Sequence, residues 1–410
     1  MSSQLRLAGA PPEPAADVPP WLAKGFRPFF LLAGLHAALI IPLWLLAVRN
    51  VVRVDGYLDP MTWHAHEMVY GYTVAVIAGF LLTAVGNWTG RETAVGVPLL
   101  ALAGLWVLGR VAFVAAGALP GELVAVADLA FLPALAVAIG RPLVATRNLR
   151  NYPVLGVVVA LWLVGLAIHL DVLGVLAPGW RFRATAGAVD LATLLVLFFS
   201  ARIFPMFTRN ATKVDAIRNW PALDWATVAV MAALTVVDVA RPGHVVGPWL
   251  AGAVAALALA RSAPWGARHT LRHPLLWILH VGHAWIVIGL ALRALAGVTD
   301  VVTSSAWVHA LTAGGLGCTT LGMMARVALG HSGRALAIGR PVTLAFLAVT
   351  LAALVRVVAP IVVAVVAPSG PTAYRAFLDA SGTLWTVAFA LFVLAYARIL
   401  TTRRADGRPG

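Results

Sequence analysis

The sequence has few charged residues and almost no cysteine. Of its 410 residues, 11% are charged and 61% are hydrophobic, and the mean hydropathy is +0.90. A soluble globular domain carries roughly a quarter charged residues, so this composition excludes an ordinary soluble enzyme or binding domain. The single cysteine, Cys318, excludes an intramolecular disulfide and a Cys-x-x-Cys-His site for covalent haem attachment.

Long hydrophobic runs fill most of the chain instead. Twelve of them are long enough, or nearly so, to cross a bilayer core of about 30 Å. They cover residues 26–48, 61–86, 94–117, 121–141, 152–176, 185–208, 224–240, 245–260, 273–296, 303–330, 341–366 and 376–400. The pattern predicts an all-α, polytopic transmembrane bundle of about twelve helices, forming one domain over residues 26–400. Residues 1–25 lack an apolar core of signal-peptide length, and they and residues 401–410 are predicted to be flexible tails.

The chain is also short of acidic residues, and its formal net charge is +14. The distribution of this charge argues against a nucleic-acid partner. Of the 30 Lys and Arg residues, 18 lie in the two tails and in the loops after even-numbered helices, and 6 lie in the loops after odd-numbered helices. By the positive-inside rule, both termini are predicted to be cytoplasmic, and the basic loops are predicted to meet anionic membrane lipid.

Histidines are prominent among the polar residues near the ends of these segments. His64 and His66 open the second segment beside Glu67, His169 ends the fifth, and His309 opens the tenth, all on the outer side. Polar groups at membrane depth are costly and usually have a partner or a function. Imidazole is also the commonest protein ligand for haem iron and copper. We therefore expect a metal centre at these four histidines, with anchoring at the lipid headgroups as the alternative.

Helix geometry limits how the histidines can share a metal. Residues two apart on a helix point about 200° from each other, so His64 and His66 can share a metal only if the helix begins between them. Otherwise they serve two centres, or one ligates and the other supports it. His280 and His331 lie towards the cytoplasmic side, and His331 is about 33 Å along its helix from His309, too far to share a metal. Glu67 is placed to orient an imidazole, bind a hard metal or pass protons.

Several arginines lie within the hydrophobic segments. Arg110, Arg293 and Arg356 lie in the outer half of the membrane, where Asp128 and Asp190 also lie. Buried charges need partners, so Arg–Asp pairing is one interpretation. The other is that one or two arginines, with Arg110 and Arg293 as candidates, bind haem propionates in bidentate fashion.

Part of the sequence recurs. With an offset of 243 residues, His66 falls on His309 and the following glycines also match: Gly71 with Gly314, Gly79 with Gly322, and Gly90 with Gly333. With an offset of 247, His36 falls on His283. One interpretation is that the first two helices are duplicated in the ninth and tenth, and the other is chance matching in a glycine-rich apolar sequence.

Eight stretches together resemble a known family. They are KGFRPFF at residues 24–30, WHAHEM at 63–68, AGFLLTAV at 78–85, NWTGR at 87–91, RIFPMFT at 202–208, WILH at 277–280, HALT at 309–312 and MMARVALGHSGR at 323–334. Over nearly the whole chain, this set closely resembles the NnrS family of bacterial haem- and copper-containing membrane proteins. Gly86 and His283 depart from residues common in the family, which puts a role for His283 in doubt.

The resemblance implies a protein of the bacterial cytoplasmic membrane that acts in nitric oxide metabolism and nitrosative-stress defence, alongside denitrification. The polar residues borne by the family's motifs are His64, His66, Glu67, His280, His309 and His331, whereas His169 matches only a loose pattern. We expect non-covalent haem b with copper, nitric oxide that arrives through membrane lipid, and an electron donor that the sequence does not identify. In an enzyme, His66 and Glu67 are the expected catalytic residues. The alternatives are a non-catalytic haem- and nitric-oxide-binding or sensing protein, and a transporter with a buried polar path.

Overall fold

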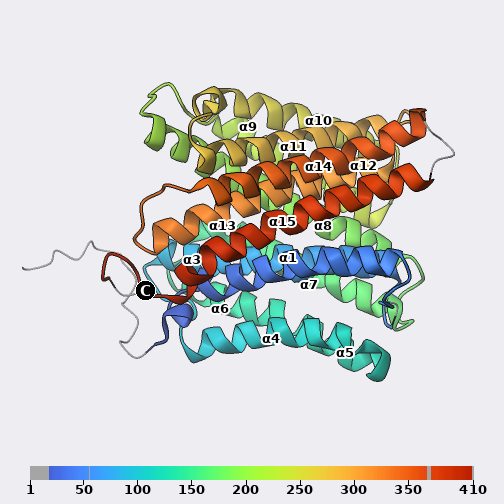
Figure 1. Ribbon diagram of the computed structural model, residues 1–410, viewed down its shortest axis with the longest axis horizontal. Helices are drawn as coiled ribbons and strands as arrows, with labels where there is room; N and C mark the ends of the chain where they lie inside the picture. Colours follow the sequence, from blue (N-terminus) through green and yellow to red (C-terminus); the bar gives the residue numbers. More distant parts are fainter. Residues whose placement is uncertain (1–17, 55, 367–370, 409–410) are drawn as a thin grey trace, which may run out of the picture.

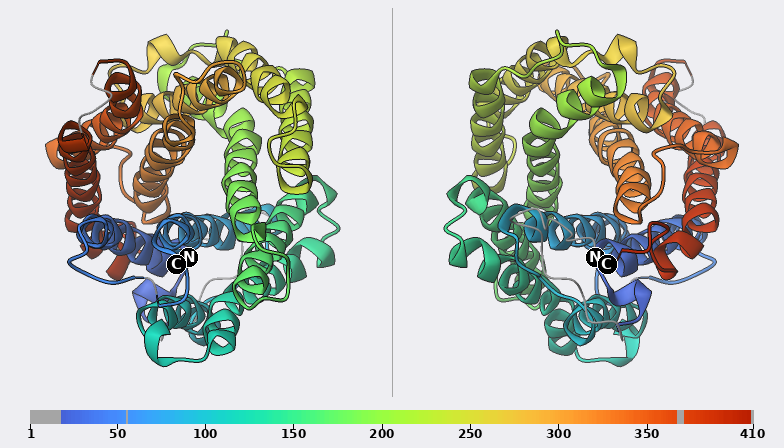
Figure 2. Two further views of the ribbon diagram at one scale, coloured as in Figure 1. Left: turned by 90° about the vertical axis from the view of Figure 1, so that its right-hand side faces the viewer. Right: turned by 90° about the vertical axis from the view of Figure 1, so that its left-hand side faces the viewer.

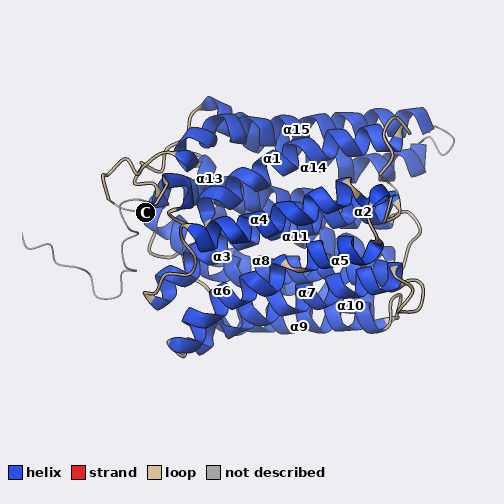
Figure 3. Cartoon of the chain, turned by 90° about the horizontal axis from the view of Figure 1, so that it is seen from below, coloured by secondary structure: helices blue, strands red, loops and turns tan. Residues whose placement is uncertain are grey.

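The computed structural model describes residues 18–54, 56–366 and 371–408. The predicted tail over residues 1–25 falls largely outside these residues. Among the described residues every regular element is helical and no strand is present, as Figure 3 shows. The long helices run side by side along one direction (Figure 1), which is the arrangement expected when each segment must satisfy its own backbone hydrogen bonds in lipid.

The elements follow the predicted order with shifted ends. They are α1 (Phe26–Val48), α2 (Pro60–His66), α3 (Val74–Thr89), α4 (Val97–Val114), α5 (Gly121–Leu129), α6 (Phe131–Ala145), α7 (Tyr152–Val172), α8 (Trp180–Thr212), α9 (Pro221–Ala240), α10 (Val246–Ser262), α11 (Pro274–Ala296), α12 (Ser304–His309), α13 (Gly317–His331), α14 (Arg340–Val366) and α15 (Pro371–Thr401). A π-helical turn, Glu67–Thr73, joins α2 to α3, and another, Ala310–Leu316, joins α12 to α13.

Eleven helices of the described chain are long and apolar enough to cross a membrane, so the protein is a multi-pass membrane protein. The predicted segment 303–330 is not among them. It forms the continuous helical run 304–331, about 42 Å long at 1.5 Å per residue, but its glycines, threonines and Arg326 lower its hydropathy. Most of its side chains are buried against other helices, so this segment does not need the apolar surface that a lipid-facing helix needs.

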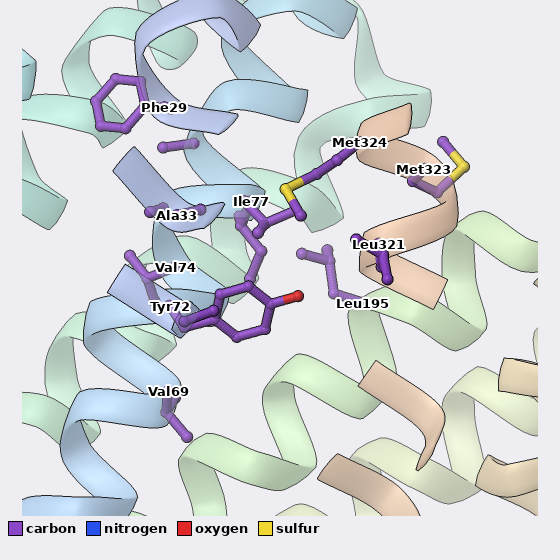
Figure 4. Packing of buried hydrophobic residues seen from close by; sticks show 14 of the residues in the cluster. Phe29, Ala33, Val69, Tyr72, Val74, Ile77, Leu195, Leu321, Met323 and Met324 are labelled. Atoms are coloured by element: carbon purple, nitrogen blue, oxygen red, sulfur yellow. The ribbon is translucent and has the colours of Figure 1, made fainter. Parts of the chain in front are cut away.

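Three helical runs form the interior of the bundle. Residues 60–89 are 83% buried in their most apolar window, α8 is 67% buried in its own, and α13 is buried along nearly all of its length. They meet in an apolar layer shown in Figure 4, where the Tyr72 ring points towards Leu195 of α8. The Tyr72 hydroxyl contacts the Thr320 hydroxyl of α13 at 2.5 Å. This contact gives the buried tyrosine hydroxyl the hydrogen bond that neither lipid nor apolar side chains could provide.

The two described ends of the chain meet on one face of the bundle. α1 packs along α15, and the Arg27 guanidinium donates to the backbone carbonyls of Leu400 at 3.3 Å and Thr402 at 2.6 Å. Figure 2 shows the bundle from both ends, with α1 and α15 side by side. A chain whose two ends lie on the same face crosses the membrane an even number of times. That this face is cytoplasmic stays a prediction.

The structure also supports the internal repeat. The two π-helical turns are both seven residues long and lie 243 residues apart. Gly90 and Gly333, which follow α3 and α13, have positive φ angles of 64° and 69°. Because these backbone details recur with the sequence matches, chance matching is a poor explanation for the repeat.

The partner helices α1 and α11 repeat with a different offset from the one predicted. A Cβ on Gly71 would meet His36 at 2.3 Å, and a Cβ on Gly314 would meet Trp285 at 2.4 Å. His36 therefore corresponds to Trp285, an offset of 249 residues rather than 247, and its match with His283 was wrong. The two-residue error moves a side chain to another face of a helix, which sequence matching alone did not detect.

Candidate metal centre

The position of His66 follows from the way its helix begins. The Asp59 carboxylate caps α2 by accepting from the Thr62 backbone N–H at 3.0 Å, and Pro60 occupies the first turn. The α-helix ends at His66, where the π-helical turn begins, so the backbone changes its winding directly after the histidine. Such π-helical turns are frequent at functional sites because they redirect side chains that a regular helix would place elsewhere.

Three buried side chains from three helices converge here. His66 of α2, Asp128 of α5 and His169 of α7 each offer a ligand atom, and these atoms lie within 4.8 Å of one another. The Nε2 atoms of both histidines lie 3.1 Å from the Asp128 Oδ2 atom. His66 is 1% exposed and His169 is 0% exposed. Although carboxylates lie near both nitrogens of the His66 ring, neither nitrogen has a partner with hydrogen-bond geometry, an unusual condition for buried polar atoms.

Charged groups border this triad. The Arg110 guanidinium donates to both the Glu67 and the Asp128 carboxylates. Glu67 also lies between two imidazoles, since its carboxylate oxygens are 3.4 Å from the His36 Nε2 atom and 3.5 Å from the His66 Nδ1 atom. With neutral histidines, two carboxylates face one guanidinium, so the site has a formal excess of negative charge. Two imidazoles and a carboxylate with this excess suit a divalent or redox-active metal cation.

A tyrosine supports the triad from outside the membrane-spanning segments. The Tyr57 hydroxyl lies 3.0 Å from the His169 Nδ1 atom. Burial, reinforced by the nearby Asp128 charge, raises the pKa of Tyr57 above its usual range, so this hydroxyl stays protonated at neutral pH. Contact through Nδ1 holds the His169 ring with its Nε2 atom directed at Asp128. This is the usual way in which an outer partner orients a metal-ligating histidine.

The other two outer histidines lie apart from the triad. The His64 ring stacks on Trp44 of α1 with centroids 4.5 Å apart. The His309 Nδ1–H donates to the Ser305 carbonyl at 2.7 Å, so Nδ1 is the protonated nitrogen of this ring. Of the four histidines expected at one centre, only His66 and His169 therefore meet in the triad, as the opposite directions of His64 and His66 on their helix allow.

The two histidines predicted nearer the cytoplasm have separate surroundings. The His280 Nε2 atom lies 3.0 Å from the Thr208 hydroxyl. His331 borders a cavity of about 340 Å³ that Arg202 and Met323 also line. No group of three or more potential ligands includes either histidine among the residues that the structure describes. Their assignment as metal or cofactor ligands stays a prediction.

The two arginines predicted to bind a cofactor have carboxylate partners in the structure. Arg110 pairs with Glu67 and Asp128, and Arg293 pairs with Asp190 at 2.7 Å and with Asp238. This is the Arg–Asp pairing that the sequence left as the other interpretation. A propionate at either arginine would have to displace an acidic partner, and such a role stays a prediction.

Sequence reasoning missed three contributors to the triad. Asp128 was considered only as a partner for arginine, and Tyr57 and His36 were not considered together with the triad at all. A signal for Asp128 existed, because a carboxylate in an apolar segment at the depth of His66 is expensive without a function. No pattern pointed to Tyr57, which lies in the loop before α2 and is far from His169 in the sequence.

Comparison with known proteins supports a family but no individual relative. The family model described as NnrS protein matches residues 20–404, nearly the whole chain. No curated protein matches the sequence significantly. Because the match includes all the helices that hold the triad, the chain belongs to the NnrS family and is a nitric-oxide-related membrane protein.

Proposed function

We propose that this protein binds nitric oxide and reduces or otherwise removes it at a metal held by His66, Asp128 and His169, in the bacterial cytoplasmic membrane. The observation that carries the proposal is the triad itself, whose buried ligand atoms lie within 4.8 Å of one another. Family membership supplies the link to nitric oxide.

The donor set fits a redox-active metal ion. Two imidazole nitrogens and one carboxylate oxygen leave further coordination positions open, as a site that must also bind a small ligand requires. A bound copper or iron ion would supply the affinity for nitric oxide and the transfer of electrons. Copper is the ion that the family resemblance implies, and the excess negative charge of Glu67 and Asp128 over Arg110 favours a cation there.

The protein's own groups have clear tasks in such a reaction. Reduction of two nitric oxide molecules to nitrous oxide and water consumes two electrons and two protons. Glu67 is positioned to hand protons on, because its carboxylate contacts His36 on one side and His66 on the other. Nitric oxide is small and apolar, so it can enter through lipid between the helices, whereas the electrons must come from a donor that remains to be identified.

A matched pair of variants tests the proposal. Asp128→Asn removes the carboxylate ligand, whereas Asp190→Asn alters another buried aspartate that pairs with an arginine, outside the triad. In purified protein given an electron donor, Asp128→Asn should lose one metal ion per chain and at least tenfold in nitric oxide consumption. Asp190→Asn should retain both within about twofold if it folds to a similar extent.

Other results would favour the alternatives. Stoichiometric binding of nitric oxide without steady consumption would favour a binding or sensing protein. Purified protein without metal and without haem absorbance would favour a transporter. If Asp128→Asn keeps both its metal and its activity, the triad is not the metal site.

A further inference from the structure

A basic cavity lies beside the last turns of α8. Its volume is about 250 Å³, and four of the side chains that line it are arginines: Arg150, Arg202, Arg209 and Arg218. Two of them come from α8, one from the short helical turn before α7 and one from the loop before α9. No acidic side chain belongs to this lining among the residues that the structure describes. The cavity therefore gathers positive charge from three separate parts of the chain.

An apolar cavity adjoins the basic one. Arg202 and Met206 line both, and the second cavity has a volume of about 340 Å³ with walls that are mostly apolar side chains of α3, α8 and α13. Met206 is 40% exposed, so the shared wall lies at the surface of the bundle. His331 borders the apolar cavity, and its backbone carbonyl accepts from Arg404 at 2.9 Å. Both cavities thus lie at the face where the two described ends of the chain meet.

The arginines of the basic cavity differ from those in the outer half of the membrane. Arg110 and Arg293 each pair with two carboxylates. Arg202 instead donates to the Asn151 side-chain oxygen at 2.9 Å, and its guanidinium carbon lies 4.2 Å from the centroid of the Phe198 ring. Within the described part of the chain, no carboxylate pairs with any of the four arginines of the basic cavity. Charge at membrane depth is costly without a counter-ion, so this cavity favours an anion from outside the chain.

Two contacts hold these arginines in place without consuming their charge. Asn151 is 5% exposed, and its bond to Arg202 fixes one edge of that guanidinium. The Arg218 backbone N–H donates to the Pro264 carbonyl at 3.2 Å, which ties the loop before α9 to the segment after α10. A guanidinium has five N–H donors in a planar fork, so donors remain available for the oxygens of a phosphate.

From these observations we propose that the two cavities together bind one anionic phospholipid of the membrane, with its phosphate among the arginines and an acyl chain in the apolar cavity. Basic pockets between helices at the cytoplasmic side are suited to anionic headgroups, and arginine matches phosphate geometry. A free phosphate ion would leave the apolar cavity unfilled, and a zwitterionic lipid would bring an ammonium group towards four arginines.

This lipid site is separate from the triad. Trp88, which lines the apolar cavity, lies near the end of the helical run 60–89, whereas His66 lies near its beginning. The inference therefore does not rest on the proposed function, and it can be tested without a measurement of turnover.

Binding of defined lipids tests the headgroup. Full-length protein is purified in detergent, its retained phospholipid is counted by native mass spectrometry, and delipidated protein is titrated with phosphatidylglycerol and with phosphatidylcholine. Wild-type protein should retain an anionic phospholipid and prefer phosphatidylglycerol by roughly tenfold or more. The double variant Arg209→Gln, Arg218→Gln should lower that affinity by about 30-fold, because each arginine near the headgroup contributes about fivefold.

The double variant is suited to this test because neither side chain forms a hydrogen bond or ion pair in the described part of the chain, so the fold does not depend on them. Arg141→Gln is the matched control. It removes an exposed arginine of α6 that lines neither cavity, and it should keep the affinity for phosphatidylglycerol within about twofold.

A further variant separates a lipid from a free anion. Ala84→Trp places a large ring in the apolar cavity and leaves all four arginines in place. It should lower the affinity for phosphatidylglycerol by about tenfold, because the acyl chain loses its apolar walls, whereas weak binding of inorganic phosphate should not change. Ala84→Val adds little volume and should have a smaller effect.

Four results would overturn the inference. They are equal affinity for phosphatidylcholine and phosphatidylglycerol, full retention of lipid by the double arginine variant, full retention by a folded Ala84→Trp protein, and loss of haem absorbance in place of lipid in that variant. The last result would assign the apolar cavity to a cofactor instead.

Discussion

The two repeats contain the same backbone features with different polar side chains. In the first, Glu67 and Asp128 neutralise Arg110 beside His66. In the second, Ala310 stands at the position that matches Glu67, and Arg356 donates to the Tyr374 hydroxyl at 3.1 Å, with no acidic partner among the described residues. The difference shows that one helical framework can hold one arginine paired with two carboxylates and another paired with a neutral hydroxyl.

The framework is common to both repeats because it rests on steric fit rather than on charge. Gly71 and Gly314, which lie within the two π-helical turns, let a ring from the neighbouring helix approach, His36 in one case and Trp285 in the other. A change in the charged side chains around either arginine leaves this close packing of the glycines unaltered. Four pairs of substitutions compare the repeats directly.

The largest contrast is expected between Arg110→Met and Arg356→Met, in protein stripped of cofactors. Loss of Arg110 leaves Glu67 and Asp128, each 4% exposed, without their cation, and this should cost about 3–5 kcal/mol of unfolding free energy. Loss of Arg356 removes one hydrogen bond to a neutral hydroxyl, worth about 1 kcal/mol. Denaturation in detergent measures both values. Equal losses would mean that the two arginines have similar electrostatic surroundings.

Gly71→Ala and Gly314→Ala test the steric framework. The new Cβ atoms would lie 2.3 Å from His36 Nε2 and 2.4 Å from Trp285 Cγ, so each ring must move, at a cost of about 1–3 kcal/mol. Only Gly71→Ala displaces a ring that contacts Glu67, so only this variant should also weaken metal binding at the triad. The measurements are the thermal unfolding midpoint and the metal content. An equal loss of that metal in Gly314→Ala would contradict the separation of the two repeats.

A smaller effect is expected at the turns that end the central helices. Gly90→Ala and Gly333→Ala place a side chain at φ angles of 64° and 69°, which costs about 1–2 kcal/mol. The cost should be higher at Gly333, where the new Cβ would lie 2.4 Å from the Asp406 carboxyl carbon. Gly104→Ala in α4 is the control, because no atom lies within 4 Å of its new Cβ. The unfolding free energy should therefore decrease most in Gly333→Ala, less in Gly90→Ala and least in Gly104→Ala.

The smallest contrast concerns the residues that cap α2 and α12. Asp59→Ala should cost about 1 kcal/mol, and Thr303→Ala, which removes a longer 3.4 Å hydrogen bond, about 0.5 kcal/mol. Burial opposes ionisation of Asp59, but hydrogen bonds from Thr62 and the Arg181 charge outweigh it and hold the pKa of Asp59 below its ordinary value of 3.8.

The two caps should therefore respond differently to acid. A carboxylate with a lowered pKa stabilises the folded protein above its ordinary pKa, and that stability is lost as the pH falls through the pKa of the folded state. The cost of Asp59→Ala should accordingly diminish below about pH 4, whereas the cost of Thr303→Ala should not change with pH. Unfolding measured across this range checks the contrast, and parallel pH curves would show that Asp59 does not cap as an anion.

Much of the fold could be predicted because its determinants are local. Apolar runs of membrane length predicted the helices. Residues 304–331 are not apolar enough to count as a membrane span, because polar and small residues interrupt the run that forms α12 and α13. The 200° separation of His64 and His66 on a helix already argued for two roles, and the structure places them in different surroundings.

The sequence by itself determined the membrane class, the helical segments, the recurring glycines and the depth of each histidine, because these depend on composition, spacing and rise per residue. Only the tertiary structure decided which polar groups meet. Asp128 and His169 join His66 from helices that are far apart in the chain. Such encounters depend on how helices pack and on where a π-helical turn redirects a side chain, and a shift of two residues there changes the face that a group occupies.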